Sequence, residues 1–339
     1  MTTDCAPLLA DVTRGGIVES QHRGIVAVAR ADGSLVAWAG DTSRVVLPRS
    51  ALKPFQAIPF MESGAPERFG FGDAELAIAC GSHSGEKRHR AVVGGMLERA
   101  GVPESALCNG ATGPYDAAQW TRWVRDEIPH SALYQNCSGK HAGMLVACVA
   151  RGYPLAGYDD LAHPQQQDVL HAVAAFFQTS PDELVVGIDG CTLPTHGAPL
   201  RNIAAGWAAL ADPEHAPEPH RAAARRLVEA MAAEPQMVAG TGLFDTVINQ
   251  ITGGRIVVKS GAEAVLCLAL RDRGLGVTFK VDDGSDRPQA VIALALLRQL
   301  DALTPDEDAA LVAHIDATVR SNRDQLVGKI RPVIELTFA

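Results

Sequence analysis

Short hydrophobic runs separated by turn residues characterise the first part of the chain. Ile25–Ala29 and Leu35–Trp38 flank Ala31-Asp32-Gly33-Ser34, in which Asp-Gly is a strong signal for a hairpin turn. A further strand near residues 16–20 would complete a three-stranded meander. This part of the sequence therefore predicts antiparallel β-structure.

From residue 50 to about residue 233, the apolar positions recur with a helical period of about 3.6 residues. Four stretches have helical spacing and length and are separated by loops that contain Gly and Pro: Gly85–Ala100, Gly139–Arg151, Gln165–Phe177 and His220–Ala233. The Pro-rich and acidic segment Asp212–Pro219 is predicted to be an exposed connector.

After residue 240 the β character returns. Short β-rich runs occupy Arg255–Lys259, Ala264–Arg271 and Gly276–Val281, followed by a predicted helix over Asp286–Leu300 and a last strand over Val333–Thr337. Strands at both ends of the chain and helices between them predict a mixed α/β fold. We expect one largely antiparallel sheet, built from both chain termini and flanked by helices.

The predicted organisation is a single chain-spanning domain over residues 1–339. The sheet part would comprise about residues 1–50 and 240–339, and the helix-rich middle about residues 51–239. A chain of 339 residues with 47% hydrophobic and 20% charged residues has the composition of a globular protein.

The net charge of the chain and the length of its apolar runs argue against two classes of partner, nucleic acid and the membrane. The chain has 30 Lys and Arg against 39 Asp and Glu, a net charge of −9, which disfavours binding to nucleic acid. The longest apolar run, Ala290–Leu297, is much shorter than the roughly 20 residues of a membrane helix. Residues 1–16 lack the pattern of a signal peptide, so we expect a cytoplasmic protein.

The seven cysteines are odd in number and irregularly spaced, which does not indicate a disulfide framework. They are Cys5, Cys80, Cys108, Cys137, Cys148, Cys191 and Cys267. In a reduced compartment they would be core residues, metal ligands or nucleophiles.

Ser50-Ala51-Leu52-Lys53 is an S-x-x-K motif at the beginning of a predicted helix. One helical turn brings the Ser50 hydroxyl within reach of the Lys53 amine, which could accept its proton when neutral. Alternatively, Ser50 is simply the N-cap of the helix. The motif is followed by Tyr134-Gln135-Asn136 and Lys259-Ser260-Gly261, and this order resembles serine β-lactamases, penicillin-binding proteins and serine-dependent glutaminases.

Three further segments carry reactive side chains. In Cys80–Glu86, Ser82 could be a second nucleophile or could orient a substrate; alternatively, Ser84 caps the next helix and His83 is solvated. Asn136–Gly143 and Gly187–His196 each hold one cysteine among glycines. Two thiolates with a nitrogen donor would suit zinc, but a disulfide, a Cys–His nucleophile pair or two buried thiols remain open.

Four of these motifs together resemble one family, the class 3 (rhizobial-type, asparaginase II) L-asparaginases. They are Arg49–Gln56, Cys80–Glu86, Asn136–His141 and Gly187–Cys191. The resemblance implies hydrolysis of L-asparagine to L-aspartate and ammonia, by a homodimer whose fold is similar to that of serine β-lactamases and glutaminases.

The resemblance also implies functional residues. Two catalytic Ser–Lys tandems of the family match Ser50 with Lys53 and Ser82 with Lys259. A metal, typically zinc, would be bound by the family's ligands, which match Cys137, Lys140 and Cys191. Lysine binds a metal only in its neutral form, so the metal would have to lower the pKa of Lys140.

Three residues are expected to contact the substrate. The guanidinium of Arg49 could donate two hydrogen bonds to a substrate carboxylate. Asp189 matches an acidic residue of the family near the metal, and His141 lies within the Asn136–His141 motif. We expect Ser50 to attack the amide carbon with Lys53 as general base. The two serines could exchange these roles.

Three alternatives stay open. The chain could be a glutaminase or another serine amidase of the same fold. It could be a zinc-dependent amidohydrolase that uses Cys137, Cys191 and a histidine from position 83, 141 or 196. It could also be a non-catalytic protein that binds a metal or senses a ligand.

Overall fold

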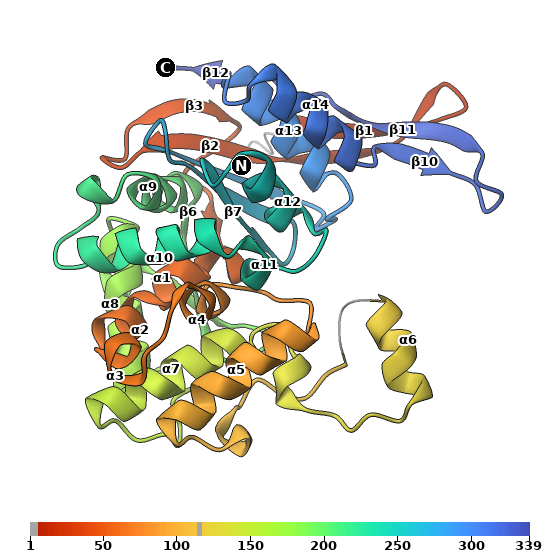
Figure 1. The fold of residues 1–339 in the computed structure, drawn as a ribbon. Coiled ribbons are helices and arrows are strands. Elements are labelled where there is room, and N and C mark those ends of the chain that lie inside the picture. Colours follow the sequence, from red (N-terminus) through yellow and green to blue (C-terminus); the bar gives the residue numbers. More distant parts are fainter. Residues whose placement is uncertain (1–5, 114–116) are drawn as a thin grey trace.

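A computed structural model describes residues 6–113 and 117–339 (Figure 1). Within these residues, both ends of the chain contribute to one antiparallel sheet with the order β10-β11-β1-β2-β9-β8-β7; β3 also pairs with β2, and β12 pairs with β3. The strands are β1 (Leu8–Arg14), β2 (Ile17–Arg30), β3 (Leu35–Ala39), β7 (Ile256–Gly261), β8 (Val265–Leu270), β9 (Leu275–Val281), β10 (Thr318–Arg320), β11 (Leu326–Pro332) and β12 (Thr337–Phe338). The predicted mixed α/β class with a largely antiparallel sheet is confirmed.

The long strand β2 belongs to two parts of the molecule. Its first half pairs with β1, where Arg14 is opposite Ile17, and its second half pairs with β3 and β9, where Gly24 is opposite Val281. Strands β1, β10 and β11 extend from the body as an arm (Figure 1). The strands predicted near residues 16–20 and at residues 25–29 are therefore one strand.

Both faces of the sheet are covered, which explains the unbroken apolar run at the end of β2. Ile25 packs into a core with α9 (Leu200–Ala211), and the next residue, Val26, packs into the opposite core with α13 (Gln289–Gln299). Gly276 in β9 permits the close approach of α9, because a Cβ there would lie 2.0 Å from the Ala204 carbonyl oxygen.

The middle of the chain is helical, as predicted. Its helices are α1 (Lys53–Gln56), α2 (Ile58–Glu62), α3 (Ala65–Phe69), α4 (Asp73–Ala79), α5 (Lys87–Ala100), α6 (Ala117–Arg125), α7 (Ser138–Arg151), α8 (Pro164–Phe176), α9, α10 (Arg221–Ala233) and α11 (Pro235–Val238). Two more helices, α12 (Phe244–Ile251) and α14 (Pro305–His314), lie later in the chain. A second sheet with the order β4-β6-β5 comprises β4 (Val45–Val46), β5 (Val185–Ile188) and β6 (Pro194–Pro199).

One predicted strand differs from the structure. The expected strand at Val333–Thr337 is not formed; β11 ends at Pro332 and only Thr337 and Phe338 pair with β3. The connector Asp212–Pro219 contains a short 3₁₀ helix at Pro213–His215. No helix in the described part of the chain has the length and apolarity needed to cross a bilayer.

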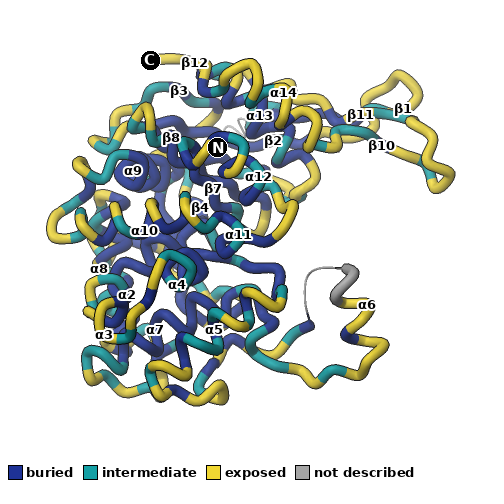
Figure 2. The backbone as a smooth tube through the Cα atoms, viewed as in Figure 1, coloured by how far each residue is buried: buried dark blue, intermediate teal, exposed yellow. Residues whose placement is uncertain are grey.

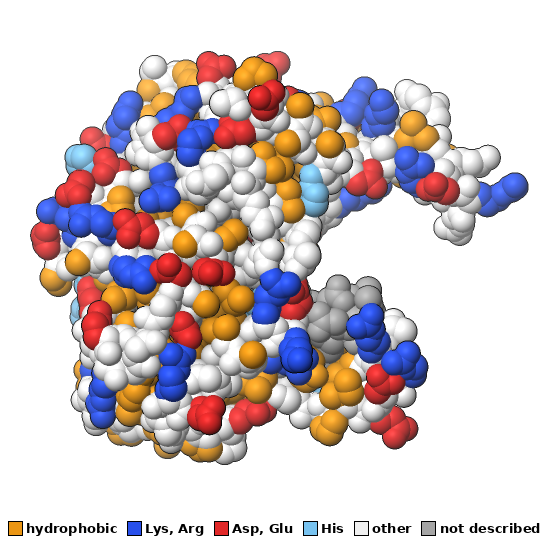
Figure 3. Space-filling model, viewed as in Figure 1, with side chains coloured by type: hydrophobic (Ala, Val, Ile, Leu, Met, Phe, Trp, Pro, Cys, Tyr) orange, Lys and Arg blue, Asp and Glu red, His pale blue; other side chains and the backbone are white. Residues whose placement is uncertain are grey.

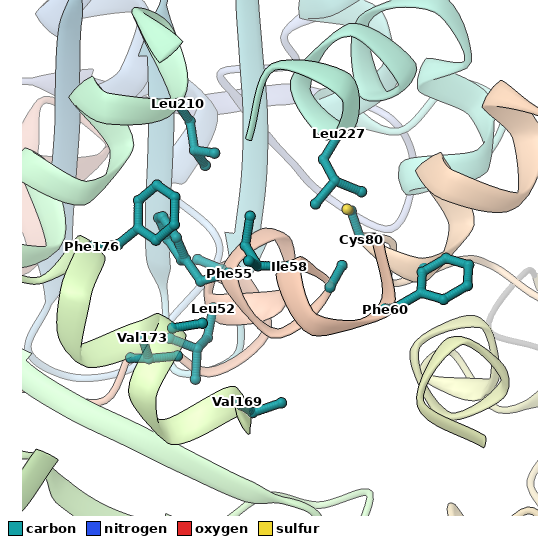
Figure 4. Close-up of a cluster of buried hydrophobic side chains, with 14 of the residues drawn as sticks. Leu52, Phe55, Ile58, Phe60, Cys80, Val169, Val173, Phe176, Leu210 and Leu227 are labelled. Carbon is teal, nitrogen blue, oxygen red and sulfur yellow. The ribbon is translucent and has the colours of Figure 1, made fainter. Parts of the chain in front are cut away.

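A dense core supports the S-x-x-K segment (Figure 4). Phe55 lies at its centre, with ring centroids 5.1 Å from Phe176 and 6.0 Å from Trp207. Figure 2 shows that the buried residues continue from this core along α7 and α4. On the surface, Figure 3 shows a recess between the arm and the part of the molecule that carries α6.

Candidate active site

Three segments meet at the amine of Lys53, the first residue of α1. Its Nζ donates hydrogen bonds to the Gly81 carbonyl at 2.5 Å, to Ser82 Oγ at 2.8 Å and to the Asn136 carbonyl at 3.5 Å. The side chain has no exposed surface. Lys53 therefore joins the S-x-x-K segment to the loop after α4 and to the residues before α7.

The surroundings of Lys53 favour its neutral form. Burial is the main cause that lowers its pKa to about 8, and the positive charges of Lys140 and Lys259 act in the same direction, against the nearby Cys137 and Cys191. A lysine with this pKa can act as a base near neutral pH, whereas an exposed lysine cannot.

Ser50 lies in a 3₁₀ helix, η1 (Arg49–Leu52), that leads into α1. The residue before it, Arg49, has a φ of 53°, a left-handed conformation that is uncommon for residues other than glycine and often marks functional sites. The serine is partly exposed. Among the described residues, no hydrogen bond joins its hydroxyl to Lys53, whose serine partner is Ser82.

The strained Arg49 is held by Asp189. Asp189 Oδ1 accepts hydrogen bonds from Arg49 Nε at 3.0 Å and Nη2 at 2.7 Å, and from the Gly190 amide at 2.7 Å. Burial raises the pKa of Asp189, but the charges of Lys140 and Arg49 and these hydrogen bonds outweigh it and hold the pKa below its usual value. Two of the three residues expected to bind the substrate thus contact each other.

Lys259 has a different partner from the expected one. Its Nζ donates to the Ser260 carbonyl at 2.6 Å and lies 3.6 Å from Asp245 Oδ2. No hydrogen bond to Ser82 is present among the described residues. Asp245, which lies in the first turn of α12, was missed by the sequence analysis because no motif surrounds it.

Cys137, Lys140 and Cys191 form a buried cluster. Their exposed fractions are 4%, 2% and 1%, and Lys140 Nζ lies 3.3 Å from Cys191 Sγ. A hydrogen bond from the Cys191 thiol is the main cause that lowers the pKa of Cys137 well below its usual value, with help from Lys53 and Lys140 against the effect of burial. The same hydrogen bond raises the pKa of Cys191.

The donor types fit zinc, because a thiolate is favoured at Cys137 and the cluster is shielded from water. Burial lowers the pKa of Lys140, but the charges of Cys191, Cys137 and Asp189 outweigh it and raise the pKa, so a bound metal would have to displace a proton from this amine. Among the described residues, no group of three or more His, Cys, Asp and Glu side chains is placed to hold a metal. The cluster contains only two residues of these types, and its third donor is the Lys140 amine.

The remaining described cysteines lack this environment. Burial raises the pKa of Cys80 and of Cys267 to about 12 and that of Cys148 to about 11, so these three thiols stay protonated. Cys108 is exposed, and Cys5 lies outside the described residues.

The histidines of the motifs are buried. His141 Nδ1 is 2.6 Å from the Tyr158 hydroxyl in the core, so its expected contact with a substrate stays a prediction. His83 is also fully buried and is hydrogen-bonded to Ser138 Oγ at 2.8 Å, which contradicts the alternative of a solvated residue. Ser84 does not cap the next helix, since α5 begins after Glu86.

Comparison with known proteins identifies one family. The model of the family L-asparaginase II matches residues 10–332 of this chain. A search of curated proteins gave no match.

Comparison with solved structures gives distant matches. A protein named Mglu is 17% identical with a TM-score of 0.37, and the match covers 83% of this chain and 67% of that chain. This chain thus spans about two thirds of the length of Mglu. A beta-lactamase from Mycobacterium bovis is 14% identical with a TM-score of 0.40, and the match covers 86% of this chain and 94% of that chain.

Proposed function

Because this chain belongs to the L-asparaginase II family and is an amidohydrolase, we propose that it hydrolyses L-asparagine to L-aspartate and ammonia. The observation that carries this proposal is the buried Lys53 amine, which contacts Ser82 and follows Ser50 by one helical turn. An amine with a lowered pKa beside two partly exposed hydroxyl groups is an arrangement that can activate a serine nucleophile.

Arg49 and Asp189 supply the two charges that recognise an α-amino acid. Asp189 uses one carboxylate oxygen for Arg49, and the guanidinium keeps further N–H groups that can donate to a substrate carboxylate. The second oxygen of Asp189 is able to accept from a substrate ammonium group. The Arg49–Asp189 pair therefore favours binding of a small amide that carries both a carboxylate and an ammonium group over binding of an amide without charged groups.

The proposed reaction begins with Ser50. Its oxygen attacks the side-chain amide carbon while Lys53 Nζ takes the hydroxyl proton, and the C–N bond then breaks as ammonia leaves with a proton passed through Ser82. The product is a β-aspartyl ester of Ser50. Water adds to this ester with Lys53 again as base, which releases L-aspartate and restores the Ser50 hydroxyl.

The proposal includes a zinc ion held by Cys137, Lys140 and Cys191. When bound, zinc would supply a positive charge that polarises a nearby carbonyl or carboxylate oxygen of the substrate. The residues themselves maintain a buried thiol and amine cluster next to Asp189, which is two positions from Cys191. Substitution at the cluster is therefore expected to weaken substrate binding as well as metal binding.

Alanine at Cys137 or Cys191 should abolish stoichiometric zinc, because each change removes one of only two thiolate donors. The matched controls are Cys148→Ala and Cys267→Ala, which remove buried thiols that stay protonated. Metal content per chain, measured by atomic emission after dialysis against zinc, should fall below about one tenth in the first pair and stay unchanged in the controls. Full zinc content in Cys137→Ala would contradict this ligand set.

Ammonia release from L-asparagine and L-glutamine tests the function directly. We expect release from L-asparagine with a higher kcat/KM than from L-glutamine. A pocket usually discriminates one methylene by only about 1–3 kcal/mol, so some release from glutamine is compatible with the proposal. Faster turnover of L-glutamine would identify a glutaminase, and no release from either substrate would contradict the proposed activity.

A further inference from the structure

The buried carboxylate of Asp245 makes three contacts at the end of β7. Its side chain is 5% exposed, and Oδ2 accepts hydrogen bonds from the Ser260 amide at 2.8 Å and the Ser260 hydroxyl at 2.9 Å. The same oxygen lies 3.6 Å from the ammonium nitrogen of Lys259. A buried carboxylate without such partners would lower the stability of the folded protein. These contacts therefore fix the position of α12 relative to β7.

Asp245 also completes the edge of a sheet. Among the strands of the described residues, β7 is the last in the main sheet and pairs only with β8. The Ser260 amide therefore has no neighbouring strand to accept its hydrogen bond on the outer side, and Asp245 takes the place of that strand. This anchor lies at the point where the strand reaches the active site.

The anchored strand end presses against the segment that carries Ser50. A Cβ placed on Gly261 would lie 2.2 Å from the Pro48 carbonyl oxygen and 3.3 Å from the Ala51 amide nitrogen. Backbone packed this closely transmits displacement, because neither side can yield without moving the other. The position of Ser260 thus determines the position of η1.

We propose that Asp245 is a positioning residue for the amidohydrolase reaction: it holds Lys259 and the Ser260–Gly261 backbone in the places that align Ser50 for attack. This inference rests on the proposed function and adds a residue that lies outside the recognised motifs. Asp245 acts through Lys259 and Ser260 and does not itself touch the substrate.

The test compares Asp245→Asn with Asp11→Asn in the full-length protein. Asparagine keeps an oxygen that accepts from Ser260 but removes the charge beside Lys259. Asp11 is a matched control, since it is 6% exposed and pairs with Arg331 in the arm, away from Lys53. We expect Asp245→Asn to lower kcat about tenfold with KM changed less than twofold, and Asp11→Asn to leave both unchanged.

Wild-type kcat in Asp245→Asn, or an equal loss of kcat in Asp11→Asn, would overturn the inference. If Asp245→Asn does not unfold cooperatively, Ser260→Ala is the second variant, because it removes one contact and keeps the buried ion pair. It should lower kcat about threefold at unchanged KM; an unchanged kcat overturns the inference. Absence of ammonia release by the wild-type protein would instead contradict the proposed function.

Discussion

Replacement of Ser50 by alanine should lower kcat by about 10⁴-fold or more, because it removes the oxygen that forms the ester. Ser82→Ala should lower kcat by only about 10²-fold, since water can replace a hydroxyl that passes a proton. Both serines are partly exposed, so neither change leaves a large cavity and both variants should fold. Steady-state ammonia release compares the two.

Direct detection of the acyl-enzyme separates the roles of the two serines. Wild-type protein quenched in acid during turnover of L-asparagine should carry an aspartyl group on the peptide that contains Ser50. The Ser82→Ala variant should carry the same adduct, because its nucleophile is intact. An adduct on Ser82 in the Ser50→Ala protein would reverse the assignment.

Lys53→Met should lower kcat by about 10³- to 10⁴-fold, because it removes the amine that takes the proton of the attacking hydroxyl in the proposed reaction. Methionine has a similar length and suits a site with no exposed surface. The change leaves the Gly81 carbonyl and Ser82 hydroxyl without their donor, which should cost about 1–3 kcal/mol of stability.

Lys87→Met is the matched control, because Lys87 is exposed at the beginning of α5 and contacts none of the active-site residues named above. Thermal unfolding of both variants separates loss of stability from loss of catalysis. A Lys53→Met protein that unfolds cooperatively and keeps more than about one tenth of the wild-type kcat would exclude Lys53 as the general base.

The sequence predicted elements whose pattern is local. Gly139–Arg151 and Gly276–Val281 were predicted within a few residues of α7 and β9, because continuous apolar runs next to turn glycines mark such buried elements. Strand β1 was not predicted. Leu8–Arg14 pairs with β11, more than 300 residues later, and its short sequence carries a charged Asp11. Val333–Thr337 has β-branched residues, but of these only Thr337 pairs with a strand, β3.

Within the candidate site, the motifs indicated which segments contribute side chains, but they did not predict which side chains contact each other. The motifs named Lys53, Ser82 and Lys259, yet their partners depend on three chain segments that meet only in the folded protein. Asp245 illustrates the limit of sequence reasoning. An aspartate in the first turn of a helix is common. The proposed role of Asp245 arises because, among the described strands, β7 pairs only with β8, which leaves the Ser260 amide to donate to Asp245.

A ribosome that makes this chain releases β2 long before its partner β9 exists, because Gly24 pairs with Val281. Until then, the apolar faces of β2 have neither a complete sheet nor α13 to cover them. Contacts between residues so distant in sequence form slowly and leave nascent chains open to aggregation. Production of active protein should therefore depend on chaperones and on slow, cool expression more than the stability of the finished fold suggests.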